Sequence, residues 1–205
     1  MLKLYGQARS RASRSLWMLE EIGLAYEHVP IRPYTESRSA EYLRINPNGH
    51  IPSLEDDGFV LWESLAINMY LAESYARSPL WPTGAKHHAR VYQWSLWSAN
   101  EIEPRIVRIA KGLSEKSSDP SAMAAELEQL SAALRILEGS LNDRYLLGDD
   151  FTVADLNIAS TLREPGEDGI SGIAAIDLAS FPNVGRWLDR CSARPANRRV
   201  ASMAD

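Results

Sequence analysis

Cysteine is almost absent from this chain. Of the 205 residues only Cys191 is a cysteine, so no disulfide can form within the chain. A chain without disulfides is typical of a reducing compartment, and we therefore expect a cytoplasmic protein. A lone thiol on an expected helix is more typical of a buried, inert residue than of a nucleophile.

Long apolar runs and clusters of basic residues are also missing. No stretch approaches the roughly 20 apolar residues that a membrane-spanning helix needs, and the start of the chain is too short and too polar for a signal peptide. The formal net charge is −5, with no basic block. We therefore expect neither a membrane nor a nucleic-acid partner.

Familiar motifs for phosphates and metals are absent as well. The sequence has no glycine-rich phosphate loop and no HExxH zinc motif. His87 and His88 are neighbours, and neighbouring side chains on a helix point apart. No other residue stands at ligand spacing from them, so we expect no metal.

Two prolines and a glycine divide the chain at residues 78–84, Ser-Pro-Leu-Trp-Pro-Thr-Gly. No regular pattern continues through this segment, which we interpret as a linker. Strand and helix patterns alternate before it, and every pattern after it is helical. With 45% hydrophobic residues the chain can build two cores. We expect one domain at 1–77 and another at 85–205.

The first half alternates strand and helix patterns. We expect strands at 2–5 and 26–31, helices at 11–23, 37–45 and 65–76, and a hairpin before the last of these helices. This order implies a mixed sheet covered by helices, which is an α/β domain.

The most informative stretch is 46–66, which reads NPNGHIPSLEDDGFVLWESLA. Its first four residues form a turn cluster that ends any preceding helix. Two short apolar runs follow, and Asp57-Gly58 between them predicts a tight hairpin turn. Pro52 stands at the start of the first run, where a strand tolerates a missing N–H.

Ser64 follows the second run, at the start of a helical pattern. A serine at this position caps its own helix. The free N–H groups and the positive end of the helix dipole also suit an anion at the same corner. The residue by itself is compatible with both interpretations.

In combination, these features resemble a known family. The stretch contains Ile-Pro-x-Leu at 51–54, a glycine-closed hairpin, and Glu-Ser-x-Ala-Ile at 63–67. This order and spacing resemble the thioredoxin-like half of cytosolic glutathione transferases. The chain looks like a serine-type, bacterial-like member.

The resemblance implies a glutathione site. Pro52 would be cis, and Ile51 before it would pair with the cysteinyl backbone of glutathione. Glu63 and Ser64 would hold the γ-glutamyl end. His50 would reach toward the glycyl carboxylate, and the alternative for His50 is an exposed turn histidine.

Ser10 is the residue on which activity would depend. The segment 4–14 looks like the family's segment after the first strand, because Ser10 stands four positions after Gly6 and four before Arg14. A free thiol has a pKa of about 8.5. A hydroxyl donor near a helix start would lower the pKa of a bound thiol and stabilise its thiolate. The alternative is that Ser10 only caps a helix, and Ser13 is a rival hydroxyl.

The second half is helical throughout. We expect helices at 86–113, where Pro104 bends the chain, and at 122–141, where a leucine stripe forms a core face. Thr152 and Asp155 predict a capping box, and Phe151 and Leu156 a hydrophobic staple. These signals resemble the helical domain of the family. The acidic segment 164–169 interrupts the helix that follows.

We therefore expect an α/β plus all-α protein, with an N-terminal thioredoxin-like domain and a C-terminal helical bundle domain. The resemblance implies a cytoplasmic homodimeric detoxification enzyme that binds glutathione and a small hydrophobic electrophile. It would stabilise the glutathione thiolate for attack on that electrophile, and so transfer an alkyl or aryl group to the sulfur. The alternatives are a glutathione-dependent peroxidase, isomerase or lyase, and a non-catalytic interaction module of the same fold.

Overall fold

A computed structural model describes residues 1–115, 119–141, 144–163 and 176–203. The chain divides into two compact units, Met1–Trp81 with Arg194–Asp205, and Pro82–Ala193. The end of the chain differs from the expected domain 85–205, because the last residues belong to the first unit. The acidic segment 164–169 lies outside the described residues.

The first unit is built on a four-stranded mixed sheet in the order β2-β1-β3-β4. Its strands are β1 (Leu2–Tyr5), β2 (Tyr26–Val29), β3 (Ser53–Asp56) and β4 (Phe59–Trp62). β1 is parallel to β2 and antiparallel to β3, and β3 is antiparallel to β4. The expected mixed sheet is confirmed.

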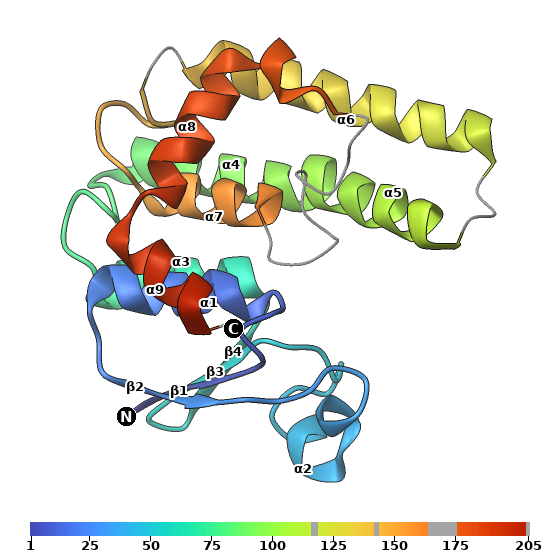
Figure 1. Cartoon of the computed structure of the whole chain (residues 1–205). Coiled ribbons are helices and arrows are strands. Elements are labelled where there is room, and N and C mark those ends of the chain that lie inside the picture. Colours follow the sequence, from blue (N-terminus) through green and yellow to red (C-terminus); the bar gives the residue numbers. More distant parts are fainter. Residues whose placement is uncertain (116–118, 142–143, 164–175, 204–205) are drawn as a thin grey trace. The chain divides into compact units, whose positions relative to one another are not determined.

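Helices cover one face of this sheet, as Figure 1 shows. They are α1 (Ala12–Ile22) and α3 (Ser64–Tyr75), and α9 (Pro195–Met203) packs against α1. Leucine and isoleucine side chains of the strands and helices are fully buried between them, among them Leu4, Leu16, Leu54, Ile67 and Leu71. A short 3-10 turn (Glu36–Arg38) and α2 (Ala40–Leu43) replace the helix expected at 37–45.

The β3–β4 hairpin has the tight turn that the sequence predicts. Asp57 has φ 46° and Gly58 has φ 91°. Two consecutive positive φ values are typical of the type I′ turn, whose twist matches that of paired strands. The turn sets the register of the hairpin, with Asp56 opposite Phe59 and Ser53 opposite Trp62.

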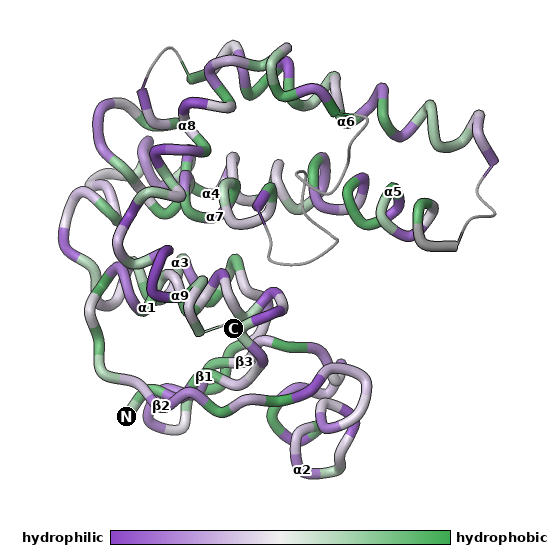
Figure 2. Tube along the Cα trace, in the orientation of Figure 1, coloured by the Kyte–Doolittle hydropathy of each residue, from purple (hydrophilic) through white to green (hydrophobic). Residues whose placement is uncertain are grey.

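The second unit is helical. It contains α4 (Ala85–Trp97), a π-helical turn (Ser98–Ile102), α5 (Glu103–Glu115), α6 (Pro120–Leu141), α7 (Val153–Leu162), a 3-10 turn (Leu178–Ser180) and α8 (Pro182–Ser192). Hydrophobic and hydrophilic residues are interspersed along α6, as Figure 2 shows. Four leucines of its stripe are fully buried, Leu130, Leu134, Leu137 and Leu141. None of the described helices is long and apolar enough to cross a membrane.

Pro104 perturbs the helix expected at 86–113. Proline has no N–H, so the Asn100 carbonyl loses the donor that an α-helix would provide. A π-helical turn precedes Pro104, and the Arg105 guanidinium donates to the carbonyls of Asn100 (3.3 Å) and Glu101 (2.7 Å). A side chain thus supplies the Asn100 carbonyl with a donor in place of the helical N–H that the proline lacks.

The predicted capping box of α7 is confirmed. The Asp155 carboxylate accepts hydrogen bonds from the Thr152 N–H and hydroxyl, and also from Leu146 N and Trp187 Nε1. Phe151 and Leu156 are both buried, as a hydrophobic staple requires. Asp155 therefore joins the start of α7 to α8 and to the loop that precedes α7.

Candidate functional site

The sheet register gathers the predicted site residues at one edge of the first unit. Tyr5, the last residue of β1, lies opposite Ser53, the first of β3. Ser53 in turn lies opposite Trp62, the last residue of β4. Three segments therefore meet at the same end of the sheet: the loop after β1, the residues before β3 and the residues after β4.

Gly6 begins the loop after β1 and has φ 142°. A Cβ atom on Gly6 would lie 2.7 Å from Ala12 Cβ and 3.3 Å from Ile51 Cβ. Only glycine fits there, because the start of α1 and the segment before β3 both approach its backbone closely. The close approach brings the Ser10 loop next to the Ile51–Pro52 segment.

Ser10 occupies a turn just before α1. Its hydroxyl donates to the Gln7 carbonyl (2.6 Å) and accepts from the Ala12 N–H (3.1 Å). The expectation that Ser10 is the helix N-cap is wrong by one position, since α1 is capped at Arg11 and begins at Ala12. Ser13 lies inside α1 and is 7% exposed, whereas Ser10 is half-buried. Ser10 is therefore the more accessible hydroxyl.

The Ile51–Pro52 bond is cis, as the family resemblance implies. The backbone before it is held from behind, because the His50 carbonyl accepts from the Tyr42 hydroxyl (2.7 Å) and from Asn46 Nδ2 (2.8 Å). Tyr42 is buried, and burial raises the pKa of its phenol. The His50 side chain is exposed.

The start of α3 carries the last two predicted residues. Ser64 is the first helical residue and Glu63 is the N-cap, so the expectation that Ser64 occupies the cap position is wrong. Glu63 has φ 74° and makes no capping hydrogen bond with its side chain. Without a side-chain cap, the first N–H groups of α3 keep their capacity to bind an anion. Ser15 Oγ donates to the Ser64 carbonyl (3.4 Å) and joins α1 to this helix start.

Sequence reasoning missed three residues near the site. Tyr42 and Asn46 support the His50 carbonyl from elements that precede β3. Arg38 donates to the Asn48 carbonyl (2.9 Å), and its side chain lies against Gly49. A basic residue close in sequence to the expected carboxylate site was the available signal for Arg38. No local pattern reveals the contacts of Tyr42.

Metal ligands do not gather in the described part of the chain. Across the ranges 1–115, 119–141, 144–163 and 176–203, no group of three or more His, Cys, Asp or Glu side chains lies close enough to hold an ion. The candidate site instead consists of hydroxyl groups, backbone groups and a few charged side chains.

Comparison with protein families finds two models. Residues 1–73 match the glutathione S-transferase N-terminal domain, and residues 102–195 match the glutathione S-transferase C-terminal domain. Both matches lie within the two regions that the sequence pattern separates.

Curated relatives match along almost the whole chain. Glutathione S-transferase GstB of Escherichia coli is 30% identical, and the alignment covers 98% of this chain and 97% of that protein. Glutathione S-transferase 3 of Zea mays is 32% identical, with 98% and 93% covered.

Solved structures agree with the fold. The structure of glutathione S-transferase-I bound with lactoylglutathione has a TM-score of 0.84 at 31% identity, with 98% of this chain and 99% of that chain covered. The theta class glutathione S-transferase of Xanthomonas axonopodis pv. citri, with glutathione bound, has a TM-score of 0.82 at 28% identity, with 97% and 95% covered. The expected thioredoxin-like domain with a helical domain is confirmed. The chain therefore belongs to the cytosolic glutathione S-transferase family.

Proposed function

We propose that this protein is a glutathione transferase that binds glutathione at the end of the sheet where β1 and β4 finish and β3 begins. Ser10 would activate the thiol of the bound glutathione. The convergence of the Ser10 loop, the Ile51–Pro52 segment and the start of α3 carries the proposal. Membership of the family supports it.

Each end of glutathione meets suitable chemistry in this arrangement. The γ-glutamyl end carries a carboxylate and an ammonium group. The N–H groups at the start of α3 and the Ser64 hydroxyl suit the carboxylate, and the Glu63 carboxylate suits the ammonium. The backbone of Ile51 suits the extended cysteinyl unit. His50 and Arg38 supply donors for the glycyl carboxylate.

Ser10 acts on the sulfur by donating a hydrogen bond. Its O–H now points to the Gln7 carbonyl and must rotate to reach a thiolate. The change of acceptor from the Gln7 carbonyl to the thiolate is favourable, because a hydrogen bond to an ionised acceptor is roughly twice as strong as one to a neutral acceptor. The thiol proton passes to solvent. The thiolate then forms a bond to an electrophilic carbon as the leaving group departs with its electron pair.

A small, largely apolar electrophile, a cytoplasmic location and a role in detoxification complete the proposal.

We also propose a homodimer. β4 is an edge strand, and its Phe59 (50%), Val60 (39%) and Trp62 (38%) side chains are exposed. An exposed apolar edge is typical of a surface that another chain covers. Sedimentation of a monomer at micromolar concentration would remove the dimer from the proposal.

Calorimetric titration with glutathione, combined with ultraviolet difference spectra across pH, tests the function. We expect binding, and a thiolate that forms below the pKa of about 8.5 of a free thiol. Binding with conjugation of an aryl or alkyl halide supports a transferase. No binding at millimolar glutathione would refute the proposal and favour a non-catalytic interaction module.

Two carboxylate variants test the γ-glutamyl subsite. Glu63→Gln removes a charge that we assign to the ligand ammonium, and we expect glutathione affinity to fall about tenfold or more. Glu73→Gln changes an exposed carboxylate on the same helix and serves as the matched control. Equal affinities for the two variants would refute the role of Glu63.

A further inference from the structure

His28 lies on β2 and contacts the root of the Ser10 loop. Its Nε2 atom is 2.7 Å from the Gly6 carbonyl oxygen, and its side chain is half-buried. A carbonyl oxygen can only accept a hydrogen bond, so Nε2 must carry the proton. Both the Nε2–H tautomer of neutral imidazole and the imidazolium ion meet this requirement.

Hydrogen-bonding partners matter more for the backbone orientation of Gly6 than they would for another residue. Glycine has no Cβ to restrict its backbone, and its φ of 142° lies where other residues are rarely found. The Gly6 N–H is held by the Val29 carbonyl (2.9 Å), and the carbonyl of Gly6 is held by His28. The first bond fixes the peptide plane before Gly6, and the second fixes the plane between Gly6 and Gln7.

That orientation controls Ser10. The next carbonyl along the chain, that of Gln7, accepts the Ser10 hydroxyl at 2.6 Å. The direction of the Gln7 carbonyl depends on the peptide plane that precedes it. A rotation at Gly6 would therefore displace the acceptor of Ser10 and the turn that holds the hydroxyl before α1.

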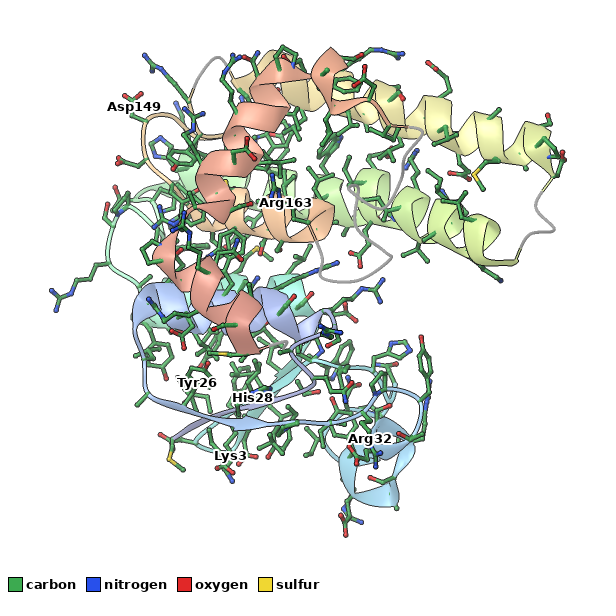
Figure 3. The ribbon with its side chains drawn as sticks, in the orientation of Figure 1. Lys3, Tyr26, His28, Arg32, Asp149 and Arg163 are labelled. Carbon is green, nitrogen blue, oxygen red and sulfur yellow. The ribbon has the colours of Figure 1, made fainter. Side chains whose placement is uncertain are left out.

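Tyr26 makes a comparable contact at the other end of the same strand. Tyr26 and His28 are alternate residues of β2 and therefore share a face of the sheet, and both are labelled in Figure 3. The Tyr26 hydroxyl donates to Glu20 Oε1 (3.0 Å), near the end of α1. β2 thus holds α1 at its end through Tyr26 and the loop before α1 through His28.

We propose that His28 is a positioning residue for catalysis, which fixes the Gly6–Gln7 peptide and thereby holds the Ser10 oxygen where its O–H can rotate to the glutathione sulfur. This inference rests on the proposed function, because it assigns to His28 an effect on the thiolate that Ser10 stabilises. His28 touches neither substrate in this scheme and acts through the backbone.

The test uses two variants of the full chain. His28→Leu removes the donor but keeps an apolar side chain of similar reach. His28→Gln keeps an N–H at a comparable distance. We expect His28→Leu to raise the pKa of bound glutathione and lower kcat by about three- to tenfold, the effect of about one lost hydrogen bond. We expect the dissociation constant of glutathione to change less than twofold, since Ile51, Glu63 and Ser64 are intact. His28→Gln should restore most of the thiolate.

Tyr26→Phe is the matched control. It removes a hydrogen bond between the same strand and α1, so it reproduces a general loss of stability without changing the Gly6 carbonyl. Tyr26→Phe should leave the pKa of bound glutathione unchanged. An equal rise in both variants, or an unchanged thiolate in His28→Leu, would overturn the inference.

Nitrogen-15 spectra of the histidines provide a readout that does not depend on glutathione. At a pH where the imidazoles are neutral, His28 should be the Nε2–H tautomer, and an Nδ1–H tautomer would overturn the inference. The outcomes also separate the two proposals. If the wild-type protein binds no glutathione, the proposed function fails, whereas a normal wild-type thiolate with no response to His28→Leu refutes only the role of His28.

Discussion

At the residue scale, the Ser10 hydroxyl makes two hydrogen bonds with its own loop. It donates to the Gln7 carbonyl and accepts from the Ala12 N–H. The acceptor side can remain in place while the O–H rotates, because a hydroxyl oxygen has two lone pairs. Ser10 can thus keep its bond to the start of α1 while its proton turns to a thiolate.

Replacing Ser10 tests this role. In Ser10→Ala we expect the pKa of bound glutathione to rise by about 1–2 units, because a hydrogen bond to a charged group contributes about 1.5–3 kcal/mol. The affinity for glutathione should change little. Ultraviolet difference titration measures the thiolate, and Ser13→Ala is the matched control. An undiminished thiolate in Ser10→Ala, or a larger loss in Ser13→Ala, would assign the role elsewhere.

Asp56 is a second residue with a measurable consequence. Burial acts to raise the pKa of its carboxyl, but hydrogen bonds from Tyr75 and Tyr70 outweigh burial and hold the pKa below its usual 3.8. A carboxyl with a lowered pKa stabilises the fold above its unfolded pKa, and this contribution is lost as pH falls through the folded pKa.

Tyr75→Phe should therefore reduce stability in a pH-dependent way. We expect the variant to have a lower free energy of unfolding than the wild type at about pH 6, and the difference to narrow by about pH 3. Urea denaturation at both pH values measures it. Tyr34→Phe, at a residue that is 83% exposed, is the control. A pH-independent difference would contradict the assignment to Asp56.

At the scale of the elements, the junction of α4 and α5 shows how one side chain compensates for a proline. Arg105 donates to the Asn100 and Glu101 carbonyls. The Asn100 carbonyl has no α-helical backbone donor at position 104, because Pro104 has no N–H. The same guanidinium group also pairs with Glu101 Oε2 at 2.9 Å. The contribution of Arg105 should therefore depend on the residue at position 104.

A double-mutant cycle tests this dependence. Arg105→Met should cost about 1–2 kcal/mol of unfolding free energy in the wild-type chain. It should cost less in a Pro104→Ala background, because alanine supplies the missing N–H. Denaturant unfolding gives all four values. Arg135→Met, which breaks an exposed pair with Glu128, should cost less than about 1 kcal/mol. Equal costs of Arg105→Met in both backgrounds would refute the coupling.

At the scale of the whole molecule, the end of the chain completes the first unit. α9 packs against α1, with Ala196 and Val200 buried. Arg194 pairs with Glu21 (2.7 Å), and Arg199 pairs with Glu20. The helix that follows Ser10 is therefore held by residues more than 170 positions away in the sequence.

Removal of residues 194–205 should destabilise the first unit. We expect a loss of at least about 2 kcal/mol, because the buried side chain of Val200 alone contributes about 1.5–3 kcal/mol. Urea denaturation measures the loss. If the truncated chain fails to fold, Val200→Ala provides a milder change, with an expected cost of about 1–2 kcal/mol. Stability unchanged by either alteration would contradict the assignment of α9 to this unit.

Much of the candidate site could be predicted from short-range patterns. Asp57-Gly58 predicts the hairpin turn because few residues tolerate its positive φ values. The capping box and staple of α7 are visible because their partners stand three to five residues apart. Ser10, Ile51, Glu63 and Ser64 are proposed as site residues because the motif spacing resembles a known family, and their roles stay a prediction. The caps of α1 and α3 were misplaced by one residue, since a cap depends on backbone angles that composition does not reveal.

The sequence by itself therefore determined the type of fold, the hairpin, the capping box and the segments that we propose for the site. Each of these depends on interactions among residues close along the chain, or on a motif spacing that resembles a known family. Only the tertiary structure decided which distant residues support the site, such as Tyr42 behind His50, His28 at Gly6 and α9 on α1. These contacts depend on sheet order and helix packing, and many different side chains at those positions would leave the local pattern unchanged.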